Sequence, residues 1–156
     1  MASRTKLTVA YLGGAFAGWQ RQRAARTVQG ELERAVSDAI GGSFAPVLGA
    51  GRTDAGVHAA GQVAHVDLPD GLPVVDAAAI LNARLPSDVR VRRAVAVAPD
   101  FHARICAVGK HYTYRIRWRR PELPWLGLRT SFHRPADHPD RLEAACRMLP
   151  GRRDWA

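Results

Sequence analysis

The sequence predicts an α+β protein built on an antiparallel or mixed sheet with its helices on one face. Two observations lead to this prediction. Apolar residues alternate with polar ones in several short segments, as in half-buried strands, and recur at helical spacing in others. Helices and strands are mixed along the chain, but several strands are expected to be antiparallel neighbours, which favours α+β. The length of 156 residues suits one compact domain.

The chain opens with a predicted strand, a basic loop and a predicted helix. Residues 6–11 alternate between apolar and polar or small side chains, which is typical of a half-buried strand. The loop at 18–23 is basic and carries one aromatic residue. Thr27 is of a type that caps helix N-termini. The helix is then predicted from the apolar spacing of Val28, Leu32, Val36 and Ile40, and it ends at Gly41 and Gly42.

Four elements are predicted in the middle of the chain. Residues 44–48 form a short strand candidate, and residues 62–68 form a second strand. A helix is expected at 76–85, closed by a proline. A further strand is expected at 89–98, with one face formed by Val89, Val91, Val95 and Val97.

The last third of the chain contains the clearest alternation. A strand is predicted at 111–119, and a final helix at 139–149 is expected to turn Leu142, Cys146 and Leu149 inward. The two faces of the strand are expected to hold Tyr112, Tyr114, Ile116 and Trp118 on one side, and His111, Thr113, Arg115, Arg117 and Arg119 on the other.

Charge indicates a polyanionic partner. The chain has 23 Lys and Arg against 14 Asp and Glu, a formal net charge of +9, and residues 101–156 alone carry +7. Such a concentration of positive charge is expected of a nucleic-acid-binding protein. A genomic bias is the alternative explanation, since 21 of the basic residues are arginines.

Several classes of protein are excluded at this stage. No apolar run reaches the roughly 18 to 20 residues of a membrane span, and the N-terminus lacks the apolar core of a signal peptide. We therefore expect a soluble, cytoplasmic protein without membrane association. Cys106 and Cys146 lie far apart without CxxC spacing, so neither a disulfide framework nor a structural zinc site is expected. The histidine spacing predicts no metal site.

The glycine-rich loop at 49–56 is the first candidate site. Its glycine spacing resembles that of a phosphate-binding P-loop, but the Lys-Ser/Thr pair that such a loop requires is absent. The glycines instead indicate a tight turn that presents Arg52 and Asp54. An arginine held beside Asp54 would favour the ionised carboxylate, which suits a nucleophile. The alternative is that Asp54 caps a turn or a helix.

A second candidate site is an RNA-binding surface on the strand at 111–119. Aromatic side chains on a sheet stack on unpaired bases, and a basic row follows phosphates. Tyr112 and the row of Arg115, Arg117 and Arg119 fit this description. The alternatives are a core tyrosine, because Tyr112 shares a face with an isoleucine, and a solvated arginine face.

Six ordered motifs together resemble the tRNA pseudouridine synthase A family. The strongest is the segment from Gly49 to His65, GAGRTDAGVHAAGQVAH, which matches the catalytic loop of the family almost throughout. The resemblance covers residues 7–120. The other motifs are GWQRQ at 18–22, RTVQG at 26–30, LNARLP at 81–86, DFHAR at 100–104 and KHYTY at 110–114.

The resemblance implies a cofactor-free isomerisation of uridine to pseudouridine in the anticodon stem-loop of tRNA, at tRNA positions 38 to 40. Asp54 would be the nucleophile, attacking either the anomeric carbon of the ribose or carbon 6 of the base. Arg52 would pair with Asp54 and help to hold the flipped nucleotide, and Tyr112 would stack on the uracil. The RNA phosphates would be contacted by Arg21, Arg23, Arg115, Arg117 and Arg119.

The resemblance also implies a particular architecture. Members of the family are about twice as long, with two pseudo-repeated α+β halves of ferredoxin-like or RRM-like type, and are expected to form homodimers. Residues 1–150 would then be the catalytic-loop half, and residues 151–156 the start of a second half absent from this chain. The alternative is a non-catalytic RNA-binding remnant that keeps the motifs.

Overall fold

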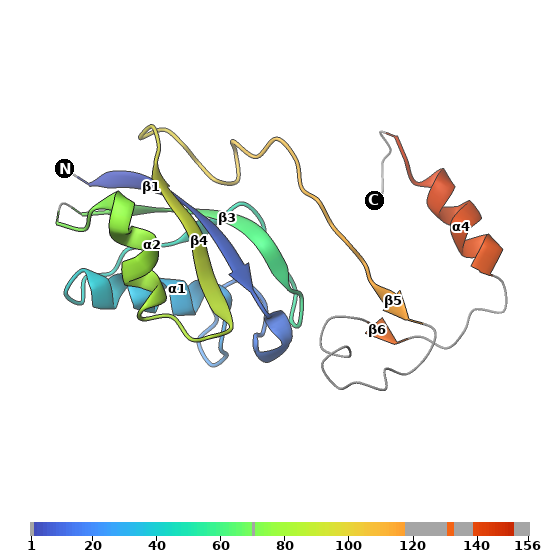
Figure 1. Ribbon diagram of the computed structural model, residues 1–156, viewed down its shortest axis with the longest axis horizontal. Coiled ribbons are helices and arrows are strands. Elements are labelled where there is room, and N and C mark those ends of the chain that lie inside the picture. Colours follow the sequence, from blue (N-terminus) through green and yellow to red (C-terminus); the bar gives the residue numbers. More distant parts are fainter. Residues whose placement is uncertain (1, 70, 118–130, 133–138, 152–156) are drawn as a thin grey trace. The chain divides into compact units, whose positions relative to one another are not determined.

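The computed structural model describes residues 2–69, 71–117, 131–132 and 139–151 (Figure 1). The chain divides into two compact units, Met1–Lys110 and His111–Ala156. The two units are described separately below.

The first unit has the chain order βαββαβ, with a short 3-10 turn after the first strand. Its four strands form one sheet in the order β2-β3-β1-β4, and each neighbouring pair is antiparallel. This is the ferredoxin-like arrangement, and it confirms the predicted α+β class. The elements are β1 (Ser3–Tyr11), η1 (Gly13–Ala15), α1 (Val28–Ala39), β2 (Leu48–Gly49), β3 (Ala59–Leu68), α2 (Val74–Asn82) and β4 (Val89–Ala96).

The core lies between the sheet and its two helices. Strand β1 is central, and its alternate residues Thr5, Leu7, Val9 and Tyr11 are buried beneath the helices. Both helices lie over the same face of the sheet (Figure 1). The predicted placement of the helices on one face is therefore confirmed. The helical side of this core is formed by Val28, Leu32, Ala35 and Val36 of α1 and Ala77 and Leu81 of α2.

Helix α1 begins and ends where the sequence predicts. The Gly30 N–H donates to Thr27 Oγ1 at 3.2 Å, so Thr27 is the N-cap. After the helix, Gly41 and Gly42 adopt positive φ values of 74° and 91°. Because glycine enters this left-handed region without a Cβ clash, the pair ends the helix.

The short strand predicted at 44–48 is wrong except at its end, since only Leu48–Gly49 forms β2. Side chains of α1 instead form the hydrogen bonds of the backbone at Val47, just before β2. The Val47 N–H donates to Glu33 Oε1 at 3.2 Å, and Gln29 Nε2 donates to the Val47 carbonyl at 3.0 Å. These bonds take the place of a strand partner at Val47.

The predicted single face of the strand at 89–98 is also wrong beyond Val91. The register of β4 shifts, because Val9 pairs with Val91 whereas Thr8 pairs with Arg93. One extra residue at this bulge exchanges the two faces of the strand. Val95 therefore lies on the opposite face from Val89 and Val91, and the core-facing position after the bulge belongs to Ala94. Val97 lies beyond the end of β4.

The second unit is described at residues 111–117, 131–132 and 139–151. Among these, the strand expected at 111–119 is formed at Ile116–Arg117, as β5, which pairs in parallel with β6 (Ser131–Phe132). Residues 111–115 have no regular secondary structure, and residues 118 and 119 lie outside the described part. Alternation assigns faces, but a strand also needs a hydrogen-bonded neighbour, and the described neighbour here has two residues.

The final helix, α4 (Pro139–Met148), is confirmed within one residue of its predicted end. Its expected inward face is not buried, because Leu142, Cys146 and Leu149 are all exposed. The helical spacing predicted an apolar face, but a buried face also requires a layer packed against it. None of the helices in the described ranges is long and apolar enough to cross a membrane.

Candidate active site

The glycine-rich loop connects β2 to β3, and hydrogen bonds to β3 fix the position of its first residues. The Ala50 N–H donates to the Val63 carbonyl at 2.7 Å, and Gln62 Nε2 donates to the Gly51 carbonyl at 2.8 Å. The backbone immediately before Arg52 is thereby fixed to the sheet. Arg52, Thr53 and Asp54 follow within three residues of these bonds.

The loop is held a second time by the segment that follows β1. The Trp19 N–H donates to the Thr53 carbonyl at 2.9 Å, and the Gly56 N–H donates to the Phe16 carbonyl at 3.3 Å. These bonds lie on either side of Asp54. The position of its backbone is therefore fixed from both directions.

Helix α1 supports this second contact. The Val28 N–H donates to the Gly18 carbonyl at 3.3 Å, and the Gln29 N–H donates to the Trp19 carbonyl at 3.0 Å. Helix N-termini leave several N–H groups without partners inside the helix, and here two of them bind the segment that holds Thr53. The first turn of α1 thus positions the loop indirectly.

Glycines allow these segments to approach closely. A Cβ at Gly49 would lie 2.6 Å from the indole ring of Trp19, which is only 2% exposed. A Cβ at Gly18 would lie 2.7 Å from the Thr53 carbonyl oxygen, and Gly18 also has a positive φ of 100°. Sequence analysis placed Trp19 in a basic loop and missed its structural role. The sequence signal for this role was an aromatic residue in one segment and glycines in another. Only the fold shows that the Trp19 ring packs on Gly49.

The side chains of Arg52 and Asp54 are exposed, in contrast to their fixed backbones. Within the described residues neither has a hydrogen bond or an ion pair, so the expected Arg52–Asp54 pair is not formed. Asp54 contributes to the turn through its backbone carbonyl, which accepts the Val57 N–H at 3.2 Å. Within the described part of the chain, its carboxylate makes no hydrogen bond to cap the turn. The Asp54 side chain is therefore exposed on a backbone that is fixed on both sides.

The candidate RNA-binding arginines of the first unit differ in their surroundings. Arg21 Nε lies 3.4 Å from Glu33 Oε2, and its guanidinium lies over the Phe44 ring. Glu33 is buried, so this pair links a half-exposed arginine to the interior. Arg23 is exposed and has no hydrogen bond or ion pair within the described part of the chain.

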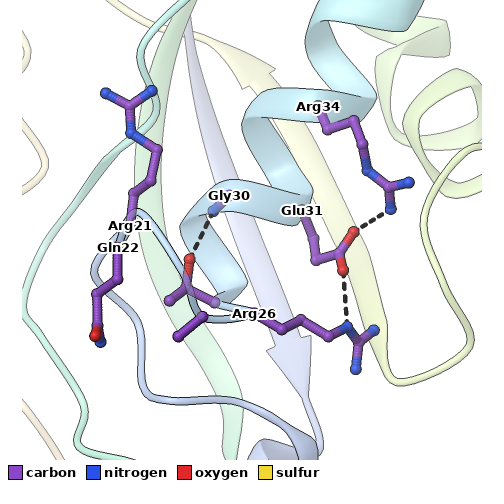
Figure 2. A pocket seen from close by; sticks show the side chains of 8 residues that line it. Arg21, Gln22, Arg26, Gly30, Glu31 and Arg34 are labelled. Atoms are coloured by element: carbon purple, nitrogen blue, oxygen red, sulfur yellow. Dashed lines mark hydrogen bonds and ion pairs between the residues drawn. The ribbon is translucent and has the colours of Figure 1, made fainter.

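A hollow of about 260 Å³ lies beside the start of α1. Figure 2 shows Arg21 and Gln22 on one side, with Glu31 between Arg26 and Arg34 on the other. Arg26 donates to Glu31 and makes two hydrogen bonds to Asp88, at 2.7 and 2.9 Å. These bonds lower the pKa of Asp88 and raise that of Arg26. Arg26 is thus a structural residue of the RTVQG motif.

The DFHAR motif also has a structural role. The Ala103 N–H donates to His65 Nδ1 at 3.1 Å, which places residues 100–104 against β3. His65 is 2% exposed, and its imidazole lies against the rings of Phe101 and His102. Burial lowers the pKa of His65, and the nearby Arg4 and His102 lower it further. Across the described ranges, no three His, Cys, Asp or Glu side chains form a cluster that could hold a metal ion.

The remaining candidates belong to the second unit. Tyr112 is 63% exposed, so the core-tyrosine alternative is wrong. Arg115 is exposed, Arg117 lies in β5, and Arg119 is outside the described residues. Tyr112 and Asp54 belong to different units.

The site and fold together define a candidate α+β enzyme with an exposed aspartate on a fixed loop. A family model described as tRNA pseudouridine synthase matches residues 7–104, which include this loop, the second half of β1 and the other three strands of the sheet. The chain belongs to the tRNA pseudouridine synthase family.

Curated relatives agree with this assignment. Three of them are named tRNA pseudouridine synthase A. The relative from Latilactobacillus sakei subsp. sakei (strain 23K) is 41% identical to this chain, and the match covers 99% of this chain and 62% of the relative. The Nitratidesulfovibrio vulgaris (strain DSM 19637 / Miyazaki F) relative is 44% identical, covering 99% of this chain and 57% of the relative. The Solidesulfovibrio magneticus (strain ATCC 700980 / DSM 13731 / RS-1) relative is 53% identical, and the match covers 79% of this chain and 46% of the relative. The chain thus spans about 60% of the length of the first two relatives.

Proposed function

We propose that this chain carries the catalytic loop of an enzyme that isomerises uridine to pseudouridine in the anticodon stem-loop of tRNA. The observation that carries the proposal is the state of Asp54. Its carboxylate is exposed and unpaired within the described residues, while bonds from Trp19 and Gly56 hold the backbone on either side. A nucleophile needs this combination, because a fixed group reaches the reacting carbon with little loss of entropy.

The proposed reaction is an isomerisation and requires no redox step. Asp54 attacks either the anomeric carbon of the ribose or carbon 6 of the uracil. The bond between base nitrogen 1 and the ribose breaks, the base turns, and a bond forms between its carbon 5 and the same ribose carbon. Carbon 5 loses a proton, nitrogen 1 gains one, and the Asp54 carboxylate is regenerated. Atoms and electrons therefore balance without a cofactor.

Two further residues have proposed roles at the nucleotide. Arg52 is exposed beside Asp54 and has no carboxylate partner in the described structure, so its guanidinium can contact the flipped nucleotide. Tyr112 is exposed and offers a ring face for stacking on the uracil. Extruding a base costs a few kcal/mol, which stacking and phosphate contacts must offset.

Contacts to the RNA backbone are proposed for the exposed arginines. Arg21 and Arg23 lie in the segment that begins at Trp19, which directly holds the Asp54 loop. Arg115, Arg117 and Arg119 would contact phosphates from the second unit. A cytoplasmic location and a homodimer are part of the same proposal, because the resemblance to the tRNA pseudouridine synthase A family implies both.

The test is a single-turnover assay with tRNA tritiated at carbon 5 of uridine, using the chain in excess. Wild type should release tritium, and Asp54→Asn should abolish release while binding tRNA within about threefold of wild type. Asp38→Asn is the matched control, since Asp38 is an exposed aspartate in α1. Equal release from Asp54→Asn would overturn the assignment of Asp54. A folded wild type that binds tRNA without release would identify an RNA-binding remnant.

A further inference from the structure

Lys110 places its side chain over the loop that carries Asp54. A Cβ at Gly51 would lie 2.8 Å from Lys110 Nζ, 3.3 Å from Cε and 4.0 Å from Cδ. The end of the lysine side chain therefore runs across the glycine surface, one residue before Arg52. The two residues come from distant parts of the sequence but belong to the same unit.

Among the residues that the structure describes, the ammonium group of Lys110 has no anionic partner. It makes no hydrogen bond or ion pair within the described ranges, and the residue is exposed. The neighbouring Gly51 carbonyl is already bound by Gln62 Nε2 at 2.8 Å. The position of this positive charge is thus set by packing of the lysine side chain against Gly51, and not by an ion pair with a described carboxylate.

A cation held in this way is suited to an anion that arrives from solution. Lysine presents a compact charge with three donors, and it binds phosphate groups as a point charge. A phosphodiester oxygen fits this site better than an uncharged base edge, because the exposed ammonium would be desolvated only for a charged partner. The nearby Arg52 is also unpaired among the described residues and adds to the local positive potential.

We propose that Lys110 binds a phosphodiester group of the RNA strand next to the nucleotide presented to Asp54. Lys110 is then a substrate-binding residue, and the absence of a side chain at position 51 keeps its ammonium in place. The proposal rests on the proposed function, since it requires an RNA substrate at the Asp54 loop.

Position 51 offers a way to move the charge without removing it. Gly51 does not have a positive φ, so alanine fits its backbone. The atom that a new Cβ would meet first is Lys110 Nζ, the end of a flexible side chain. Gly51→Ala should therefore fold and displace the ammonium, whereas Lys110→Met removes the charge and Lys110→Arg keeps it.

The experiment measures tRNA affinity as a function of salt in the Asp54→Asn background, where no turnover occurs. Lys110→Met should reduce the slope of log affinity against log salt by about 0.7 to 0.9, the value for one phosphate contact. Lys110→Arg should retain the slope, and Gly51→Ala should weaken binding at least twofold. Lys6→Met is the matched control, because Lys6 is the other lysine of the chain and lies over the Phe101 ring. Its slope should equal that of the parent.

An unchanged slope in folded Lys110→Met would overturn the proposal. So would a fall in single-turnover rate at saturating tRNA with unchanged affinity, in a chain with Asp54 intact, since this would indicate action on the reacting base. Failure of the proposed function looks different. In that case the chain with Lys110 and Asp54 intact would release no tritium, whether or not it binds tRNA.

Discussion

Tyr11 Oη lies 2.8 Å from Thr53 Oγ1, within hydrogen-bonding distance. The bond joins the last residue of the central strand β1 to the residue between Arg52 and Asp54. Tyr11 is itself 4% exposed and contacts the Trp19 ring. Strand β1 is thus linked to the loop through the Tyr11 side chain. This link adds to the hydrogen bond from the Trp19 N–H to the Thr53 carbonyl.

We expect Tyr11→Phe to loosen the loop without unfolding the sheet. Loss of this hydrogen bond should lower the free energy of unfolding by about 1 kcal/mol and reduce the single-turnover rate more than tRNA affinity. Urea denaturation and the tritium assay measure the two effects. Tyr114→Phe is the matched control, because Tyr114 is 88% exposed. A wild-type rate in folded Tyr11→Phe would remove the hydroxyl from loop positioning.

Two adjacent glycines should differ in how much stability they lose on substitution by alanine. A Cβ at Gly13 would lie 2.0 Å from the Val57 carbonyl oxygen, a backbone atom, so Gly13→Ala must displace one of the two segments. We expect a loss of about 1–3 kcal/mol in unfolding free energy. Gly14 has no atom within 4 Å of such a Cβ, so Gly14→Ala should change stability by less than about 1 kcal/mol. Equal urea midpoints for the two variants would contradict the close approach.

Stability should decrease as the pH falls below the ordinary pKa of histidine. Burial lowers the pKa of His65 in the folded state, with Arg4 and His102 adding to the effect and Asp67 opposing it. The unfolded chain therefore binds more protons below about pH 6.5, and folding loses free energy as the pH falls further. Protonation of Nδ1 would also break the bond from Ala103.

Urea unfolding at pH 7.5 and pH 5.0 measures this effect. His65→Gln should be less stable than wild type at pH 7.5 but should show a smaller loss on acidification. His111→Gln is the control, because His111 is exposed and lies in the other unit. An identical pH dependence in wild type and His65→Gln would assign the acid sensitivity to other groups.

Local signals in the sequence predicted the helices and the central strand. Helix α1 has a capping threonine before it and two glycines after it, and both act within a few residues of the helix ends. The alternation of β1 was equally clear, because one of its faces is buried from Thr5 to Tyr11. The Asp54 loop was found through its motif, and its glycine content indicated close packing.

The features that were missed depend on contacts between distant segments. The bulge beside Arg92 is a property of the register between β1 and β4, and the alternation of valines gave no sign of it. The bonds from Gln29 and Glu33 to Val47 replace a strand partner through side chains. The contact of Lys110 with Gly51 likewise joins residues whose local sequences carry no mutual signal.

The position of β1 at the centre of the sheet has a consequence for synthesis on the ribosome. Both of its neighbours follow much later in the chain, since Ser3 pairs with Leu68 and Thr5 pairs with Ala96. Pairings between such distant segments form slowly. A nascent chain that has emerged only as far as Asp54 therefore lacks both strands that pair with β1, and the four-stranded sheet that supports the loop can form only after β4 has been synthesised.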